Sequence, residues 1–207
     1  LKKGSNKKIL YFTDPRNFGT ICFTKEDFLK KKLNNLGPDY LKEKLDEKIL
    51  KNRIAKYLKI SNRRGKNKIV KVLMGQNLKD GLGSGIGNYL AAEILYDSKI
   101  SPHKTIEEIY NNHDLIKKLT QSIKCIVKLS YYSNYIGYME IFNDFKKEHN
   151  KMIKDKIIND YHPDIKIKNK QFEFKVYRQK YDKYNNKVKA EKIINGRTTY
   201  WVPKLQS

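Results

Sequence analysis

The residues best placed to do chemistry form a glycine-rich turn that leads into an amphipathic helix, from Gly83 to Tyr96. Glycine at Gly83, Gly85 and Gly87 allows the backbone to approach a ligand closely and to adopt angles that other residues avoid. Asn88 follows directly, and the first N–H groups of a helix lack intrahelical partners, which suits a phosphate group. The segment predicts a phosphate-binding turn in which Asn88 clamps the phosphate, caps the helix, or does both.

The charge of the chain indicates what kind of phosphate this is. Its 207 residues include 45 Lys and Arg against 22 Asp and Glu, a formal net charge of +23. Such an excess favours polyanions, with nucleic acid ahead of an anionic membrane surface. Abundant Lys and scarce Arg are typical of an AT-rich genome, but that bias does not explain a twofold excess of positive charge. We therefore expect a nucleic-acid partner and no membrane.

Other phosphate-binding and metal-binding patterns do not fit. The glycines lack the G-x-G-x-x-G order and the βαβ unit of a dinucleotide fold, and no Gly-Lys-Ser/Thr follows them. Cys22 and Cys125 lie far apart, and the four histidines show no close ligand spacing. We expect no metal and no other cofactor. The two cysteines fit a reduced intracellular setting, without distinguishing a nucleus from a cytoplasmic replication site or a virus-infected cell.

Several elements must position the turn. A pair of strands is predicted over residues 8–23, with turn chemistry at Asp14-Pro15-Arg16-Asn17. Thr24 is predicted to cap a helix that the Gly37-Pro38 break ends. Apolar spacing predicts further helical segments over 39–60, 68–76, 88–98, 105–111 and 115–127.

The last third of the chain changes character. Four tyrosines between 131 and 138 predict a tyrosine-rich turn, and we favour core packing over base stacking for them. Another helix is predicted over 139–147. From Phe172 the apolar period becomes two, which predicts a strand through Val176. A hairpin with strands near 188–194 and 197–202 ends the sequence.

Four segments then occur in one order along nearly the whole chain. They are Asp14-Pro15-Arg16-Asn17-Phe18-Gly19, Leu36-Gly37-Pro38, Gly85-Ile86-Gly87-Asn88 with Tyr89-Leu90-Ala91-Ala92-Glu93-Ile94-Leu95, and Val176-Tyr177 with Gly196-Arg197-Thr198-Thr199-Tyr200-Trp201 and Pro203-Lys204-Leu205-Gln206. Together they resemble the formamidopyrimidine-DNA glycosylase / endonuclease VIII (Fpg/Nei) family of base-excision repair enzymes. The segment between Gln76 and Asn88 is longer than that family's usual pattern.

The resemblance implies an α+β fold in three parts. Residues 1–24 would be the last strands of a truncated N-terminal β-sandwich, residues 25–160 a helical DNA-binding domain with a helix–two-turns–helix motif, and residues 170–207 a finger hairpin. The family's finger normally carries four zinc-binding cysteines. Here the late pair falls at Val202 and Leu205, and the early pair falls among residues 182–187, which contain no cysteine.

A tetrahedral zinc site of the all-cysteine type needs four thiolates. The chain therefore resembles the zincless-finger branch of the family. We expect apolar packing of Tyr200, Trp201, Val202 and Leu205 to hold the hairpin instead.

The resemblance also implies roles for four residues in DNA binding. Asn88 matches the residue that contacts a phosphate near the lesion, and Arg197 matches the finger arginine that grips the phosphates beside the flipped nucleotide and is linked to δ-elimination. Arg16 and Phe18 match the loop that enters the duplex where the damaged base has left. Arg197 as a solvated hairpin arginine and Phe18 as ordinary strand core are the alternatives.

Family members attack the sugar with the amine of an N-terminal Pro while the adjacent Glu donates protons. This sequence opens with Leu1-Lys2-Lys3 and has neither residue there. We expect a DNA glycosylase with AP lyase activity that removes oxidised bases and nicks damaged duplex or single-stranded DNA, represented as a fragment without its catalytic N-terminal segment and acting as a monomer. One alternative is a catalytically inactive remnant that binds damaged or abasic DNA. A weaker alternative is an RNA-binding protein, and the finger motif argues against it.

Overall fold

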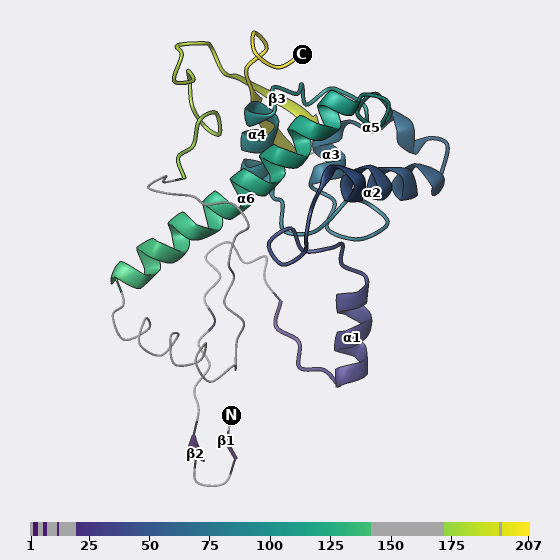
Figure 1. The fold of residues 1–207 in the computed structure, drawn as a ribbon. Helices are drawn as coiled ribbons and strands as arrows, with labels where there is room; N and C mark the ends of the chain where they lie inside the picture. The colour runs from purple at the N-terminus through teal and green to yellow at the C-terminus, as the bar shows by residue number, and fades with distance from the viewer. Residues whose placement is uncertain (1, 4–5, 8–11, 13–19, 142–171, 195) are drawn as a thin grey trace. The chain divides into compact units, whose positions relative to one another are not determined.

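The computed structural model describes residues 2–3, 6–7, 12, 20–141, 172–194 and 196–207, with backbone alone for residues 2–3, 6–7 and 132–141. The chain forms two compact units, residues 1–34 and residues 35–207. Figure 1 shows the path of the chain from the short strands β1 and β2 to the C-terminal hairpin. Each unit is described by itself.

The first unit contains little regular structure. Strand β1 (Lys2–Lys3) pairs antiparallel with β2 (Asn6–Lys7), and helix α1 spans Glu26–Asn34. The expected strand pair over 8–23 is wrong where the chain is described, because residues 12 and 20–23 form no strand. Strands β1 and β2 pair with each other and not with residues 20–23, and an unpaired strand is not stable in water.

Helix α1 matches its predicted position. It carries Glu26 and Asp27 in its first turn and ends before Gly37, but it begins at Glu26, so Lys25 and not the predicted Thr24 is its N-cap residue. None of its residues is buried in the described structure.

The second unit is built from helices that precede one hairpin. Asp46 caps α2, its carboxylate accepting the Ile49 N–H at 2.8 Å, so the helical part of 39–60 begins only after residue 46. The other elements lie close to their predicted positions, except that α6 extends well beyond its predicted end. The helical elements are α2 (Glu47–Lys59), the 3-10 turn η1 (Arg64–Lys66), α3 (Ile69–Leu73), α4 (Asn88–Asp97), α5 (Ile106–Tyr110) and α6 (His113–Ile141).

Helix α6 corrects the prediction for the tyrosine-rich segment. The backbone stays helical through Ile141, so residues 131–138 form no turn. No proline interrupts this stretch, and a helix that has formed extends at low cost because each added residue gains a hydrogen bond. Tyr131 is exposed on this helix. The predicted helix over 139–147 lies outside the described residues beyond 141.

The hairpin is confirmed, whereas the strand before it is not. Strand β3 (Lys189–Ile194) pairs antiparallel with β4 (Arg197–Trp201), with an irregularity between Glu191 and Ile194. Residues 172–176 form no strand. The backbone N–H groups of Lys175 and Val176 bind a side chain of α4 instead of a neighbouring strand, as described below.

Two apolar clusters hold the second unit together. The larger one joins α2 through α6 and includes Leu50, Ile69, Ile94 and Ile123, all fully buried. The smaller one lies between α4 and the C-terminal segment, and its members are Ala92, Tyr96, Val176, Val188 and Val202, with Tyr177, Tyr200 and Leu205 against them. Helix α4 contributes to both clusters, so it is the element on which the hairpin is mounted (Figure 1). None of the described helices is long and apolar enough to cross a membrane.

Candidate nucleic-acid interface

The start of α4 presents open backbone donors, as the glycine pattern predicts. Gly85 has a φ of +95°, which glycine adopts without strain. Gly87 is the N-cap residue, and no side chain caps the helix. Asn88 is therefore the first residue of the helix rather than its cap. The N–H groups of its first turn have no intrahelical acceptor, and together they form a small region of positive potential.

Asn88 joins this helix start to the hairpin. Its side-chain N–H donates to the Thr198 carbonyl of β4 at 3.0 Å. Thr198 follows Arg197, so the contact brings the strand that carries Arg197 beside the glycine-rich turn. The Asn88 Oδ1 atom is buried and has no hydrogen-bond partner within the described structure.

Arg197 begins β4 directly after Gly196, whose φ is +73°. The side chain is exposed, and no hydrogen bond or ion pair joins it to another described residue. A guanidinium group with five free N–H donors can bind a phosphate through two parallel hydrogen bonds. Of the four residues expected to contact DNA, Asn88 and Arg197 are thus brought to one corner, whereas Arg16 and Phe18 lie outside the described residues.

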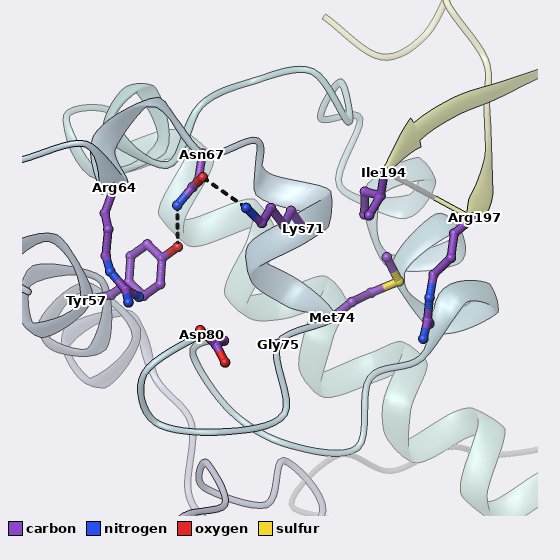
Figure 2. A pocket seen from close by; sticks show the side chains of 9 residues that line it. All are labelled: Tyr57, Arg64, Asn67, Lys71, Met74, Gly75, Asp80, Ile194 and Arg197. Carbon is purple, nitrogen blue, oxygen red and sulfur yellow. Dashed lines mark hydrogen bonds between the residues drawn. The ribbon is translucent and has the colours of Figure 1, made fainter. Parts of the chain in front are cut away.

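A cavity of about 370 Å³ opens beside Arg197 (Figure 2). The hairpin contributes Ile194 and Arg197 to one side, and α2, η1, α3 and the loop after α3 form the rest. Asn67 donates to the Tyr57 hydroxyl at 2.7 Å and accepts from the Lys71 ammonium at 3.5 Å. The lining residues are Tyr57, Arg64, Asn67, Lys71, Met74, Gly75, Asp80, Ile194 and Arg197.

The loop between α3 and α4 is held at its base by Gln76. The side-chain amide donates to the carbonyls of Met74 at 2.9 Å and Ile86 at 2.7 Å, and its oxygen accepts the Gly85 N–H at 2.8 Å. The neck of the loop is tight, because a Cβ on Gly75 would lie 2.2 Å from the Asp80 carbonyl oxygen. These contacts fix both the wall of the cavity and the approach to Asn88.

A buried carboxylate attaches α4 to the segment before the hairpin. Glu93 is 1% exposed and accepts the backbone N–H groups of Lys175, Val176 and Tyr177 at 2.9 to 3.1 Å. Burial raises the pKa of the Glu93 carboxyl above its ordinary value, and the three N–H donors offset part of that rise. The interaction occupies the N–H groups of Lys175 and Val176, at the end of the strand predicted over 172–176.

A second buried carboxylate organises the turn before β3. Asp182 accepts the N–H groups of Tyr184 at 2.9 Å and Asn186 at 2.8 Å, the Asn186 side-chain amide, and the Tyr96 hydroxyl at 3.0 Å. Burial acts to raise the pKa of Asp182, but these hydrogen bonds outweigh it, and the pKa lies below its ordinary value. The turn is thereby attached to α4 through Tyr96.

The turn after β4 is fixed in a similar way by an amide. The Gln206 oxygen accepts the Val202 N–H at 2.7 Å, and its amide donates to the Ile100 carbonyl at 2.9 Å. Val202 is fully buried, and Leu205 packs against the smaller apolar cluster. In the described part of the chain, no group of three or more His, Cys, Asp and Glu side chains is arranged to hold a metal ion.

Sequence reasoning did not identify Glu93, Asp182 and Gln206 as organising residues. Glu93 carried a signal, because it is the one acidic residue within the apolar run Leu90 to Leu95. A carboxylate on the buried face of a helix needs donors, and that need predicts a nearby backbone segment with free N–H groups.

Comparison with known proteins supports the Fpg/Nei resemblance. The family model of the formamidopyrimidine-DNA glycosylase C-terminal domain matches residues 163–207. A formamidopyrimidine-DNA glycosylase of Prochlorococcus marinus (strain MIT 9215) is 31% identical over 207 residues, which cover 95% of this chain and 58% of the relative. The chain thus spans somewhat more than half the length of this relative.

Solved structures share the fold at lower identity. A crystal structure of a viral DNA glycosylase has a TM-score of 0.53 and 23% identity, covering 91% of this chain and 56% of that protein. A complex between the Lactococcus lactis Fpg and DNA containing an abasic site also has a TM-score of 0.53 and 23% identity, covering 89% of this chain and 57% of that protein. The solved structures share the fold, and the family model and the curated relative together support membership of this chain in the Fpg/Nei family.

Proposed function

We propose that this chain is the DNA-binding region of a base-excision-repair glycosylase with AP lyase activity. The enzyme removes oxidised bases and nicks the strand. The observation that carries the proposal is the Asn88–Thr198 hydrogen bond at 3.0 Å. It gathers an amide, the open N–H groups of α4 and the strand bearing Arg197 at one corner. Such a corner suits a kinked phosphate backbone, and the net charge of +23 favours DNA as its source.

The proposed organisation has three parts. Residues 1–24 belong to a β-sandwich, residues 25–160 form the helical domain with its helix–two-turns–helix motif, and residues 170–207 form a zincless finger. Supporting the zincless finger, Val202 and Leu205 lie in apolar surroundings, and polar clamps from Asp182 and Gln206 fix the two turns of the hairpin.

Within this function, Asn88 holds a phosphate near the lesion. Arg197 grips the phosphates beside the flipped nucleotide and assists δ-elimination. Arg16 and Phe18 fill the gap in the duplex. We assign the amine nucleophile and its proton-donating Glu to the whole enzyme outside these 207 residues, since the relatives are longer than this chain.

The test is binding of the monomeric protein to a duplex that contains an abasic-site analogue. Asn88→Ala and Arg197→Ala are each expected to weaken binding by about 1–3 kcal/mol, the usual effect of losing a hydrogen bond to a charged group. Arg63→Ala is the matched control, because Arg63 is exposed and does not line the cavity. Fluorescence anisotropy at fixed salt measures the affinities.

Unchanged affinity in both variants, with an intact thermal transition, would remove these two residues from the interface. Borohydride trapping on abasic DNA distinguishes an active lyase from the catalytically inactive alternative. The trapping uses a protein that includes the N-terminal segment with the amine nucleophile. A covalent adduct identifies the lyase, and binding without an adduct identifies the remnant.

A further inference from the structure

The cavity beside Arg197 carries an excess of positive charge. Its lining includes the cations of Arg64, Lys71 and Arg197 and the single carboxylate of Asp80. That carboxylate accepts the Asn77 side-chain N–H at 2.6 Å, so part of its hydrogen-bonding capacity is already used. The balance of charge predicts an anionic ligand.

Two of the cations retain unused donors. Lys71 is exposed and donates one hydrogen bond, to Asn67, and an ammonium group has three N–H donors. Arg197 makes no hydrogen bond to another described residue. Arg64, in contrast, lies over the Tyr57 ring at 4.6 Å and donates to the Lys79 carbonyl, so it braces the wall.

The cavity also offers groups for the uncharged part of a ligand. Met74 and Ile194 form an apolar part of the lining, and Figure 2 shows the Met74 side chain next to that of Arg197, with Ile194 on the far side of Met74. The Tyr57 hydroxyl already accepts from Asn67, so its own proton is available to a ligand. A volume of about 370 Å³ exceeds what a phosphate alone would fill and lies near the lower end of the usual range for small-ligand sites.

We propose that this cavity binds one nucleotide unit of the DNA strand, next to the phosphate that Arg197 holds. Lys71 binds the phosphate of that unit, and Met74 with Ile194 contacts its sugar. The inference rests on the proposed function, because it takes the bound DNA strand as the ligand. It extends the interface from the hairpin across to α3.

The experiment couples single protein charges to single phosphates. An abasic-analogue duplex is made in versions that each replace one phosphate with a neutral methylphosphonate, and affinities are measured for the protein, Lys71→Met, Arg197→Ala and Lys117→Met. Lys117 is an exposed lysine of α6 that does not line the cavity, which makes it the matched control. Lys71 is itself exposed, so its replacement leaves the core intact.

We expect that neutralising one particular phosphate weakens binding of the unsubstituted protein several-fold. The same change in the DNA should not weaken binding of the Lys71→Met variant any further. A neighbouring phosphate should show the same behaviour with Arg197→Ala. In a salt titration, Lys71→Met should also lower the slope of log affinity against log salt by about one, since one phosphate contact is lost. Lys71→Arg should restore the coupling.

The cavity assignment is overturned if Lys71→Met behaves like Lys117→Met at every position, or if Lys71 and Arg197 couple to the same phosphate. It is also overturned if deoxyadenosine monophosphate binds through Lys71 while no phosphate of the duplex couples to it. If Asn88→Ala and Arg197→Ala weaken binding and Lys71→Met does not, only this inference fails. If none of the three affects binding, the proposed function fails with it.

Discussion

Two buried carboxylates show how single side chains attach the C-terminal region to α4. Glu93 and Asp182 both accept several N–H groups, yet their pKa values move in opposite directions. For Glu93 the effect of burial dominates, whereas for Asp182 the hydrogen bonds dominate. Asp182 therefore stabilises the folded state more as a charged carboxylate than as a protonated acid, and it fixes the turn that precedes β3.

We predict that Asp182→Asn lowers the free energy of unfolding by about 1–3 kcal/mol at neutral pH, because a charged acceptor of four donors is lost. Since the folded-state pKa of Asp182 is depressed, its contribution is present above the unfolded pKa of about 4 and disappears as the pH falls through the folded value. Thermal unfolding between pH 2 and pH 7 measures the effect.

The variant should differ most from the parent near pH 7 and least at the acid end. Asp27→Asn is the control, because Asp27 is exposed on α1 and lies outside the turn that Asp182 organises. A difference that stays constant over the whole pH range would mean that the charge of Asp182 is not what holds the turn.

At the scale of elements, the loop between α3 and α4 depends on glycine for close backbone packing. We predict that Gly75→Ala destabilises the protein by about 1–3 kcal/mol, since its Cβ would lie 2.2 Å from the Asp80 carbonyl oxygen and the loop must shift. Gly87→Ala is the matched control, because nothing lies within 4 Å of a Cβ there. Denaturant unfolding compares the two, and equal stability would show that the neck is loose.

Glycine placement and apolar spacing within short segments predicted several elements correctly. The start of α4 and both strands of the hairpin are found where glycine placement and apolar spacing indicate. The predicted strand over 172–176 was wrong, and the N–H groups of Lys175 and Val176 at its end bind Glu93, a partner more than 80 positions earlier. The cavity was not predictable from local patterns either, because Lys71 and Arg197 are far apart in the sequence and line one cavity only in the folded protein.

At the scale of the whole molecule, the two units differ sharply in how much they bury. The described members of both apolar clusters begin at Tyr40, and α1 leaves Phe28, Leu29 and Leu33 about half exposed. We predict that removing residues 1–34 changes the melting temperature of the remainder by no more than about 2 °C, an effect of roughly one kcal/mol or less. Calorimetry measures it.

Removal of residues 182–207 is the comparison, because it deletes Val188 and Val202 from the smaller cluster and should lower the melting temperature markedly. A large loss of stability after removing residues 1–34 would mean that this unit supports the rest of the protein.

The hydrogen bonds between the helices and the hairpin region carry a consequence for the order of folding. They join residues 82 to 110 positions apart, from Glu93–Lys175 to Asn88–Thr198. Contacts of such sequence separation form slowly, whereas the contacts within α2 through α6 are closer in sequence. During synthesis the helices emerge first, before the residues that pack against Ala92 and Tyr96 in the smaller apolar cluster. Docking of the hairpin is then the last step, and a nascent chain that ends before Thr198 has its helices but not the hydrogen bond that joins Asn88 to β4.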